Sequence, residues 1–144
     1  MHPLLAYTNL RPSAALDQFR AILLRGAKPS NPAYLPVETL LVLASMRVIA
    51  RNKFGGRNRH LMPAPAPQLA ALTHRSLGSI HAKMANLDGS LQNAAGHETE
   101  VYDYFAAAPQ ELEETYLLML AAARLVGISA VQLPDFLGLA GHSL

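Results

Sequence analysis

Apolar positions along the chain recur at steps of three and four, the spacing of one face of an α-helix. This pattern predicts helices over residues 13–25, 36–52, 67–74, 79–87, 98–108 and 109–126. The helix at 36–52 is apolar on most sides, so we expect it to be the central buried helix. Pro36 at a helix start and Gly26 and Gly127 after helix ends suggest the boundaries. No segment has the pattern of a strand, and the sequence therefore predicts an all-α fold.

A length of 144 residues predicts one domain, spanning 1–144. Within it we expect an irregular arm at 1–12, an accessory helix and loop at 13–35, and a core at 36–126. Ser13 is the expected cap of the accessory helix, whose apolar face includes Leu16, Phe19, Ile22 and Leu23. The remaining tail, 127–144, contains several large apolar residues and is expected to dock on the core, through Leu133, Phe136, Leu137 and Leu139.

Composition narrows the class of protein. Hydrophobic residues make up 51% of the chain and charged residues 15%, which is ample for a buried core. There is no cysteine, which excludes disulfides and cysteine metal sites and fits a reducing cytoplasm. No uninterrupted apolar run is long enough to span a membrane, and the first residues do not have the pattern of a secretory leader. We expect a cytoplasmic protein without membrane association.

Charge is strongly segregated along the chain. Residues 39–87 contain no acid and seven cations: Arg47, Arg51, Lys53, Arg57, Arg59, Arg75 and Lys83. Residues 88–144 reverse the sign, with eight acids against Arg124 alone, so the near-neutral total of +2 conceals a charge dipole. A segment without acids presents no repulsion to a polyanion, which favours a nucleic-acid partner.

Residues 67–87, inside the acid-free segment, have the layout of a helix-turn-helix. Ala70 is small where a second helix would cross the first, and a short polar break follows at 75–78. The second helix has an inward apolar stripe, Leu77, Ile80, Met84 and Leu87, which leaves Ser79, Ala82, Lys83 and Asn86 outward and His81 at the edge. His74 stands where such turns usually have glycine, in a left-handed conformation that histidine tolerates. A helical hairpin that only packs in a core remains the alternative.

This layout predicts a duplex-DNA site. Small and polar outward residues suit a helix in the major groove, with Asn86 or His81 reaching base edges. A base methyl group would lie in an apolar pocket around Ala82 or Leu77. Ser76 and Ser79 are expected to cap the helix and present amides to phosphate. The glycine-hinged loop before the motif adds phosphate contacts, and the full set expected at the DNA is Arg51, Lys53, Arg57, Arg59, His60, His74, Arg75, Ser76, Ser79, His81, Ala82, Lys83 and Asn86.

Residues 75–88, Arg-Ser-Leu-Gly-Ser-Ile-His-Ala-Lys-Met-Ala-Asn-Leu-Asp, resemble the signature in the helical N-terminal domain of bacterial HNH endonucleases of the modification-dependent restriction type. The resemblance extends loosely over 35–126. It implies a compact, winged-helix-like DNA-binding module without an evident wing, with Arg75, Ser76, Ser79 and Lys83 at the DNA. It also implies a reader of 5-methylcytosine or another modified base, acting alone or beside an HNH nuclease domain or subunit.

Other chemistry finds less support in the sequence. His74 and His81 lack the further ligands of a zinc site, no His-Asn-His set can be assembled, and no phosphate-binding glycine loop follows a strand. We therefore expect no metal, no cofactor and no catalytic activity. Tyr102, Tyr104 and Phe105 suggest core packing more than stacking on a flipped base. The alternatives are a dimeric transcription regulator or antitoxin-type DNA-binding protein, and a helical module whose basic face meets an acidic protein; the chain is either a monomer or a homodimer.

Overall fold

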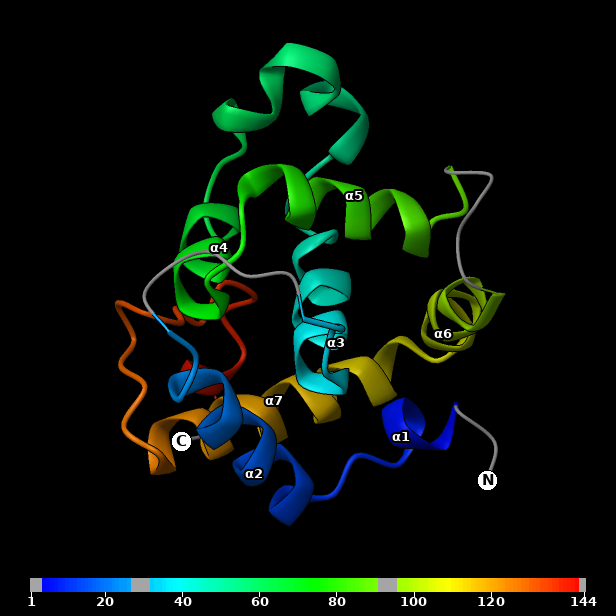
Figure 1. The fold of residues 1–144 in the computed structure, drawn as a ribbon. Coiled ribbons are helices and arrows are strands. Elements are labelled where there is room, and N and C mark those ends of the chain that lie inside the picture. The colour runs from blue at the N-terminus through cyan, green and yellow to red at the C-terminus, as the bar shows by residue number, and fades with distance from the viewer. Residues whose placement is uncertain (1–3, 27–31, 91–95, 143–144) are drawn as a thin grey trace.

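The structure is a computed structural model that describes residues 4–26, 32–90 and 96–142. Its described residues form helices joined by short connections, with no strand among them, which confirms the all-α class (Figure 1). The α-helices are α1 (Leu5–Thr8), α2 (Pro12–Leu23), α3 (Pro36–Ser45), α4 (Ala66–Thr73), α5 (Leu77–Leu87), α6 (Gly96–Ala107) and α7 (Pro109–Leu125). The 3-10 helices are η1 (Arg51–Phe54), η2 (Gly56–Leu61) and η3 (Ala140–His142).

Helix α3 is the centre of the fold, as its apolar sequence predicts. Every residue from 37 to 45 is buried, and the helix contacts α1, α2, α4, α5 and α7. It ends at Ser45, earlier than the expected residue 52. The Ser45 hydroxyl donates to the carbonyl of Val42 at 2.6 Å, a local bond that competes with helix continuation, and the following turn places Ile49 in the core.

The N-terminal segment differs from the expected arm. Residues 5–8 form α1, and Tyr7 is buried against the core. Helix α2 begins at Pro12, with Arg11 as its N-cap, so the prediction that Ser13 caps this helix is wrong. Its buried face is Ala15, Phe19 and Ile22, and it packs along α7. Leu23, which was expected on the buried face, is exposed.

Helices α6 and α7 lie close to their predicted bounds, and α7 crosses the side of the molecule opposite the segment between α3 and α4 (Figure 1). The tail folds back: Ile128 and Leu133 are buried, and the Tyr116 hydroxyl donates to Asp135 Oδ1 at 2.6 Å. Arg124 donates to the carbonyls of Ile128, Ser129 and Leu133. No helix in the described ranges combines the length and apolar character needed to cross a membrane.

Candidate nucleic-acid interface

The segment between α3 and α4 forms an arch over α5 (Figure 1). We call residues 51–61, which make η1 and η2, the basic cap. Gly56, the first residue of η2, has φ 62°, a left-handed value that glycine adopts without steric cost. Phe54 is half-buried and packs against the core, so it anchors the cap. Lys53, Arg57, Arg59 and His60 are all exposed.

Arg59 fastens the cap to the start of α5. Its Nε donates to the carbonyl of Gly56 at 3.0 Å. Its Nη1 would lie 3.3 Å from a Cβ atom at Gly78, so the absence of a side chain at Gly78 lets the guanidinium rest on the helix. This packing places a cation beside the positive end of the α5 dipole, and both repel other cations and attract anions.

The connection between α4 and α5 has the predicted local geometry. His74 adopts a left-handed conformation, with φ 56° and ψ 43°, at the position where glycine is usual. Ser76 is the N-cap of α5, and its hydroxyl accepts from the Ser79 amide at 3.0 Å. Ser79 did not prove to be a second cap, because its hydroxyl lies 3.0 Å from that of Tyr34.

Arg75 is buried, and this corrects its expected place at the DNA. Its Nε donates to Glu38 Oε2 at 2.8 Å, and its Nη2 donates to Glu38 Oε1 at 3.2 Å. Its Nη1 and Nη2 also donate to the carbonyls of Pro32 and Ala33. The guanidinium also lies 3.8 Å from the ring centroid of Tyr34. With 0% of the side chain exposed, Arg75 cannot reach a phosphate in this conformation. Glu38, at the edge of the acid-free segment, draws it inward.

Lys83 is likewise turned away from solvent, so its expected outward position is wrong. Its Nζ lies 2.8 Å from Glu98 Oε2 of α6 and 4.5 Å from the Tyr34 ring centroid. The rest of the α5 surface expected to face DNA is only half-exposed, at Ser79, His81, Ala82 and Asn86. His81 Nε2 lies 3.3 Å from the carbonyl of Arg51, so the basic cap covers part of this surface.

Acids that precede and follow residues 39–87 in the sequence neutralise much of the positive charge of this segment. Four of its seven cations form ion pairs: Arg47 with Glu113, Arg51 with Asp88, Arg75 with Glu38, and Lys83 with Glu98. Within the described ranges, the other three, Lys53, Arg57 and Arg59, form none. The charge available to a polyanion is therefore concentrated on the basic cap.

Two of the pairing acids have a lowered pKa. At Glu38, burial alone would raise the pKa, but hydrogen bonds from Arg25 and Arg75 outweigh it and lower the pKa from its ordinary 4.5. At Asp88, burial again opposes ionisation, and hydrogen bonds from Ser90 and Arg51 lower the pKa. Both carboxylates thus stay charged and keep their arginines paired at neutral pH.

The sequence does contain a signal for this pairing. Glu38 is the single acid between Asp17 and Asp88, and it begins the central apolar helix. A charged residue in that setting is buried only with partners, and arginine is the usual one.

No family model, curated protein or solved structure matches this chain. The resemblance to HNH endonuclease domains therefore remains a prediction. Among the described residues, no group of three or more histidine, aspartate or glutamate side chains is placed to hold a metal ion.

Proposed function

We propose that this protein binds duplex DNA through phosphate contacts made by the basic cap. The observation that carries the proposal is the set of three exposed cations, Lys53, Arg57 and Arg59, that lack an acidic partner in the described parts of the chain. The glycine-joined 3-10 helices present them on one arch, and the start of α5 lies directly beneath Arg59. Such contacts give affinity without reading sequence.

The proposed DNA contacts are fewer than those expected from the sequence. Arg75 and Lys83 are not among them, because both are buried in ion pairs. We do not propose that α5 inserts into the major groove, since the α5 residues expected to face the groove are only half-exposed. Reading of 5-methylcytosine, an HNH nuclease partner and a dimeric regulator remain predictions, and the function proposed is binding alone.

The dependence of affinity on salt tests the proposal. Each phosphate contact contributes about −0.9 to the slope of log affinity against log salt, so three contacts predict a slope of about −2.7. The double variant Lys53→Gln with Arg57→Gln should bind less tightly and reduce the slope by about 1.8. Fluorescence anisotropy with a labelled duplex of random sequence measures both quantities.

A control variant that loses the same charge elsewhere separates the effect of the basic cap on DNA binding from the effect of net charge. Arg11 and Arg20 are also exposed, on the α2 side of the molecule, opposite the cap in Figure 1. The variant Arg11→Gln with Arg20→Gln removes the same charge and should leave the slope unchanged. Equal losses in the two double variants would contradict the proposal. If an acidic protein rather than DNA is the partner, the wild-type chain will fail to bind duplex even at low salt.

A further inference from the structure

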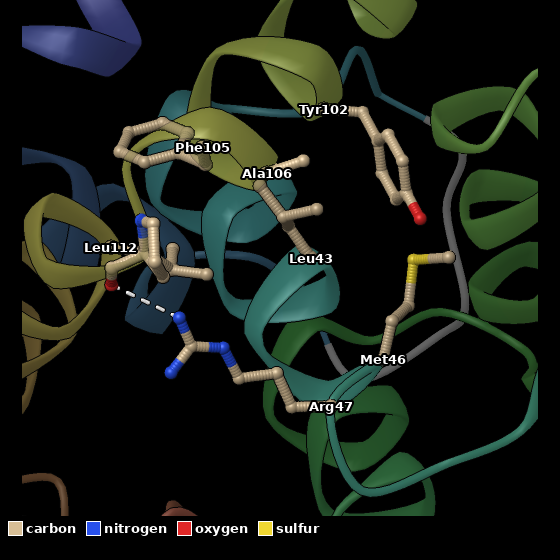
Figure 2. Close-up of a pocket in the computed structure, with 8 residues that line it drawn as sticks. Leu43, Met46, Arg47, Tyr102, Phe105, Ala106 and Leu112 are labelled. Carbon is tan, nitrogen blue, oxygen red and sulfur yellow. Dashed lines mark hydrogen bonds between the residues drawn. The ribbon is translucent and has the colours of Figure 1, made fainter.

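A pocket of about 240 Å³ opens between α3, α6 and the start of α7 (Figure 2). Its floor consists of buried side chains, Leu43, Phe105 and Leu112. Met46 and Tyr102 line one side, and Figure 2 shows the Tyr102 hydroxyl directed toward the Met46 thioether. The pocket therefore combines an apolar base with an aromatic and a thioether wall, both of which favour contact with a flat ring.

The rim holds two polar groups that are already in position. Arg47 donates to the carbonyl of Pro109 at 3.0 Å and to Glu113 at 3.1 Å, which fixes the guanidinium and balances its charge (Figure 2 shows the first bond). Its other N–H groups remain as donors. The Tyr102 hydroxyl forms no hydrogen bond with any described residue. Because Glu113 neutralises the arginine, a neutral ligand with hydrogen-bond acceptors suits this rim better than an anion.

Volume limits the ligand further. A cavity of about 150 Å³ is large enough for benzene, and sites for drug-sized ligands begin at about 300 Å³. A pocket of about 240 Å³ lies between these sizes and fits a single or fused planar ring. We propose that this pocket binds one neutral heteroaromatic ring with the chemistry of a nucleobase, packed on the apolar floor and hydrogen-bonded by Arg47 and the Tyr102 hydroxyl.

The same ring chemistry has two sources, a free nucleoside and a base extruded from bound DNA. Only the second rests on the proposed function. Extrusion requires less energy at a mismatch, where pairing is already weakened. Binding to cytidine and adenosine therefore tests the pocket itself, and binding to a duplex with one mismatched pair tests the second source.

Two neighbouring alanines supply a matched pair of variants. Ala106 lines the pocket, whereas Ala107 is exposed in the same helix turn and does not line it. Ala106→Phe should fill the volume and weaken nucleoside binding at least tenfold. Ala107→Phe should leave binding within twofold of wild type, and Tyr102→Phe, which removes only the hydroxyl, should weaken it several-fold. Methyl NMR of labelled methionine follows binding at Met46, and circular dichroism checks that each variant folds.

Saturable movement of the Met46 signal with either nucleoside, lost in Ala106→Phe, is the expected result. No movement with either nucleoside, or an unchanged affinity in Ala106→Phe, overturns the proposal. If Ala106→Phe also loses preference for the mismatched duplex, the ring is an extruded base; if duplex binding is unaffected, the ligand is a free molecule. The Lys53→Gln, Arg57→Gln variant should keep nucleoside binding, so failure of the cap and failure of the pocket are distinguishable.

Discussion

Glu38 lies between two arginines that come from opposite sides of it in the sequence. Arg25 donates to both carboxylate oxygens, at 2.7 and 2.8 Å, and Arg75 donates to the same two. The backbone amide of Leu35 adds a further bond at 2.9 Å. This set of bonds joins the end of α2, the start of α3 and the α4–α5 connection around one buried charge. Removing one partner of such a buried set is expected to cost about 3–5 kcal/mol.

Glu38 should also govern part of the acid sensitivity of the fold. Its pKa is lowered in the folded state, so the unfolded chain takes up a proton at a higher pH than the folded one. The stability it contributes is therefore present above its ordinary pKa and is lost as the pH falls through the folded pKa. Glu38→Gln should be less stable at neutral pH and should lose less further stability below about pH 5. Urea unfolding at several pH values measures both effects.

Asp17→Asn is the control for this experiment. Asp17 is 78% exposed and pairs with an exposed arginine, so its removal should change the free energy of unfolding by less than about 0.5 kcal/mol. Asp88 and Asp135 also have lowered pKa values and will keep some acid dependence in every variant. An acid dependence in Glu38→Gln as steep as in wild type would contradict the assigned role.

At the scale of helices, the sequence was most informative where the signal is local. The spacing of apolar residues along 109–126 and 79–87 depends only on near neighbours, and the helices lie close to those bounds. The left-handed conformation of His74 was likewise predicted from the turn around it. The start of α2 and the end of α3 were harder to predict. Pro12, in the first turn of α2, competes with Ser13 as a helix-start signal, and the Ser45 side-chain bond competes with continuation of α3.

The candidate site was predicted less well because pairing between distant residues is not local. A lysine on the polar side of a helix is normally solvated, and for this reason the sequence predicted that Lys83 would point outward. Its partner Glu98 lies on another helix, and nothing in the spacing of either helix indicates that they meet. Lys53, Arg57 and Arg59 were placed correctly on the surface, since a glycine-rich segment without apolar periodicity has little reason to be buried.

The Lys83–Glu98 ion pair between α5 and α6 gives a prediction that separates an effect on folding stability from an effect on DNA binding. Lys83→Met leaves Glu98 buried without its cation, and should lower the free energy of unfolding by about 3–5 kcal/mol. The same variant should leave the salt dependence of DNA binding unchanged, because the Lys83 side chain is only 10% exposed. Chemical unfolding and anisotropy on the same sample test both parts.

A second variant controls for loss of folding in this experiment. Lys83→Met combined with Glu98→Leu removes both charges and should recover much of the lost stability. If the double variant is folded but has a shallower salt slope than wild type, Lys83 contacts DNA after all, and the larger footprint predicted from sequence is restored.

At the scale of the whole molecule, the ion pairs leave the basic cap as the unpaired cationic surface of residues 39–87, within the described parts of the chain. Three of the eight acids that follow residue 87, namely Asp88, Glu98 and Glu113, each pair with a cation of residues 39–87. What remains for a polyanion is the basic cap, on the side of the molecule opposite α7 (Figure 1). The affinity of one chain should therefore be that of weak, non-specific binding, about 10⁻⁴–10⁻⁶ M at physiological salt.

The number of chains on the DNA follows from the same reasoning. One chain brings one cap, so a single chain on a short duplex should give a slope near −2.7, whereas two chains bound together should give about twice that value. Sedimentation of the complex supplies the stoichiometry independently. We expect a slope near −2.7 with one chain per duplex of about one helical turn, which is roughly 10 base pairs. A slope near −5 at the same stoichiometry would mean that cations other than Lys53, Arg57 and Arg59 also contact DNA. Contact by Arg51, Arg75 or Lys83 would require their ion pairs to open on binding.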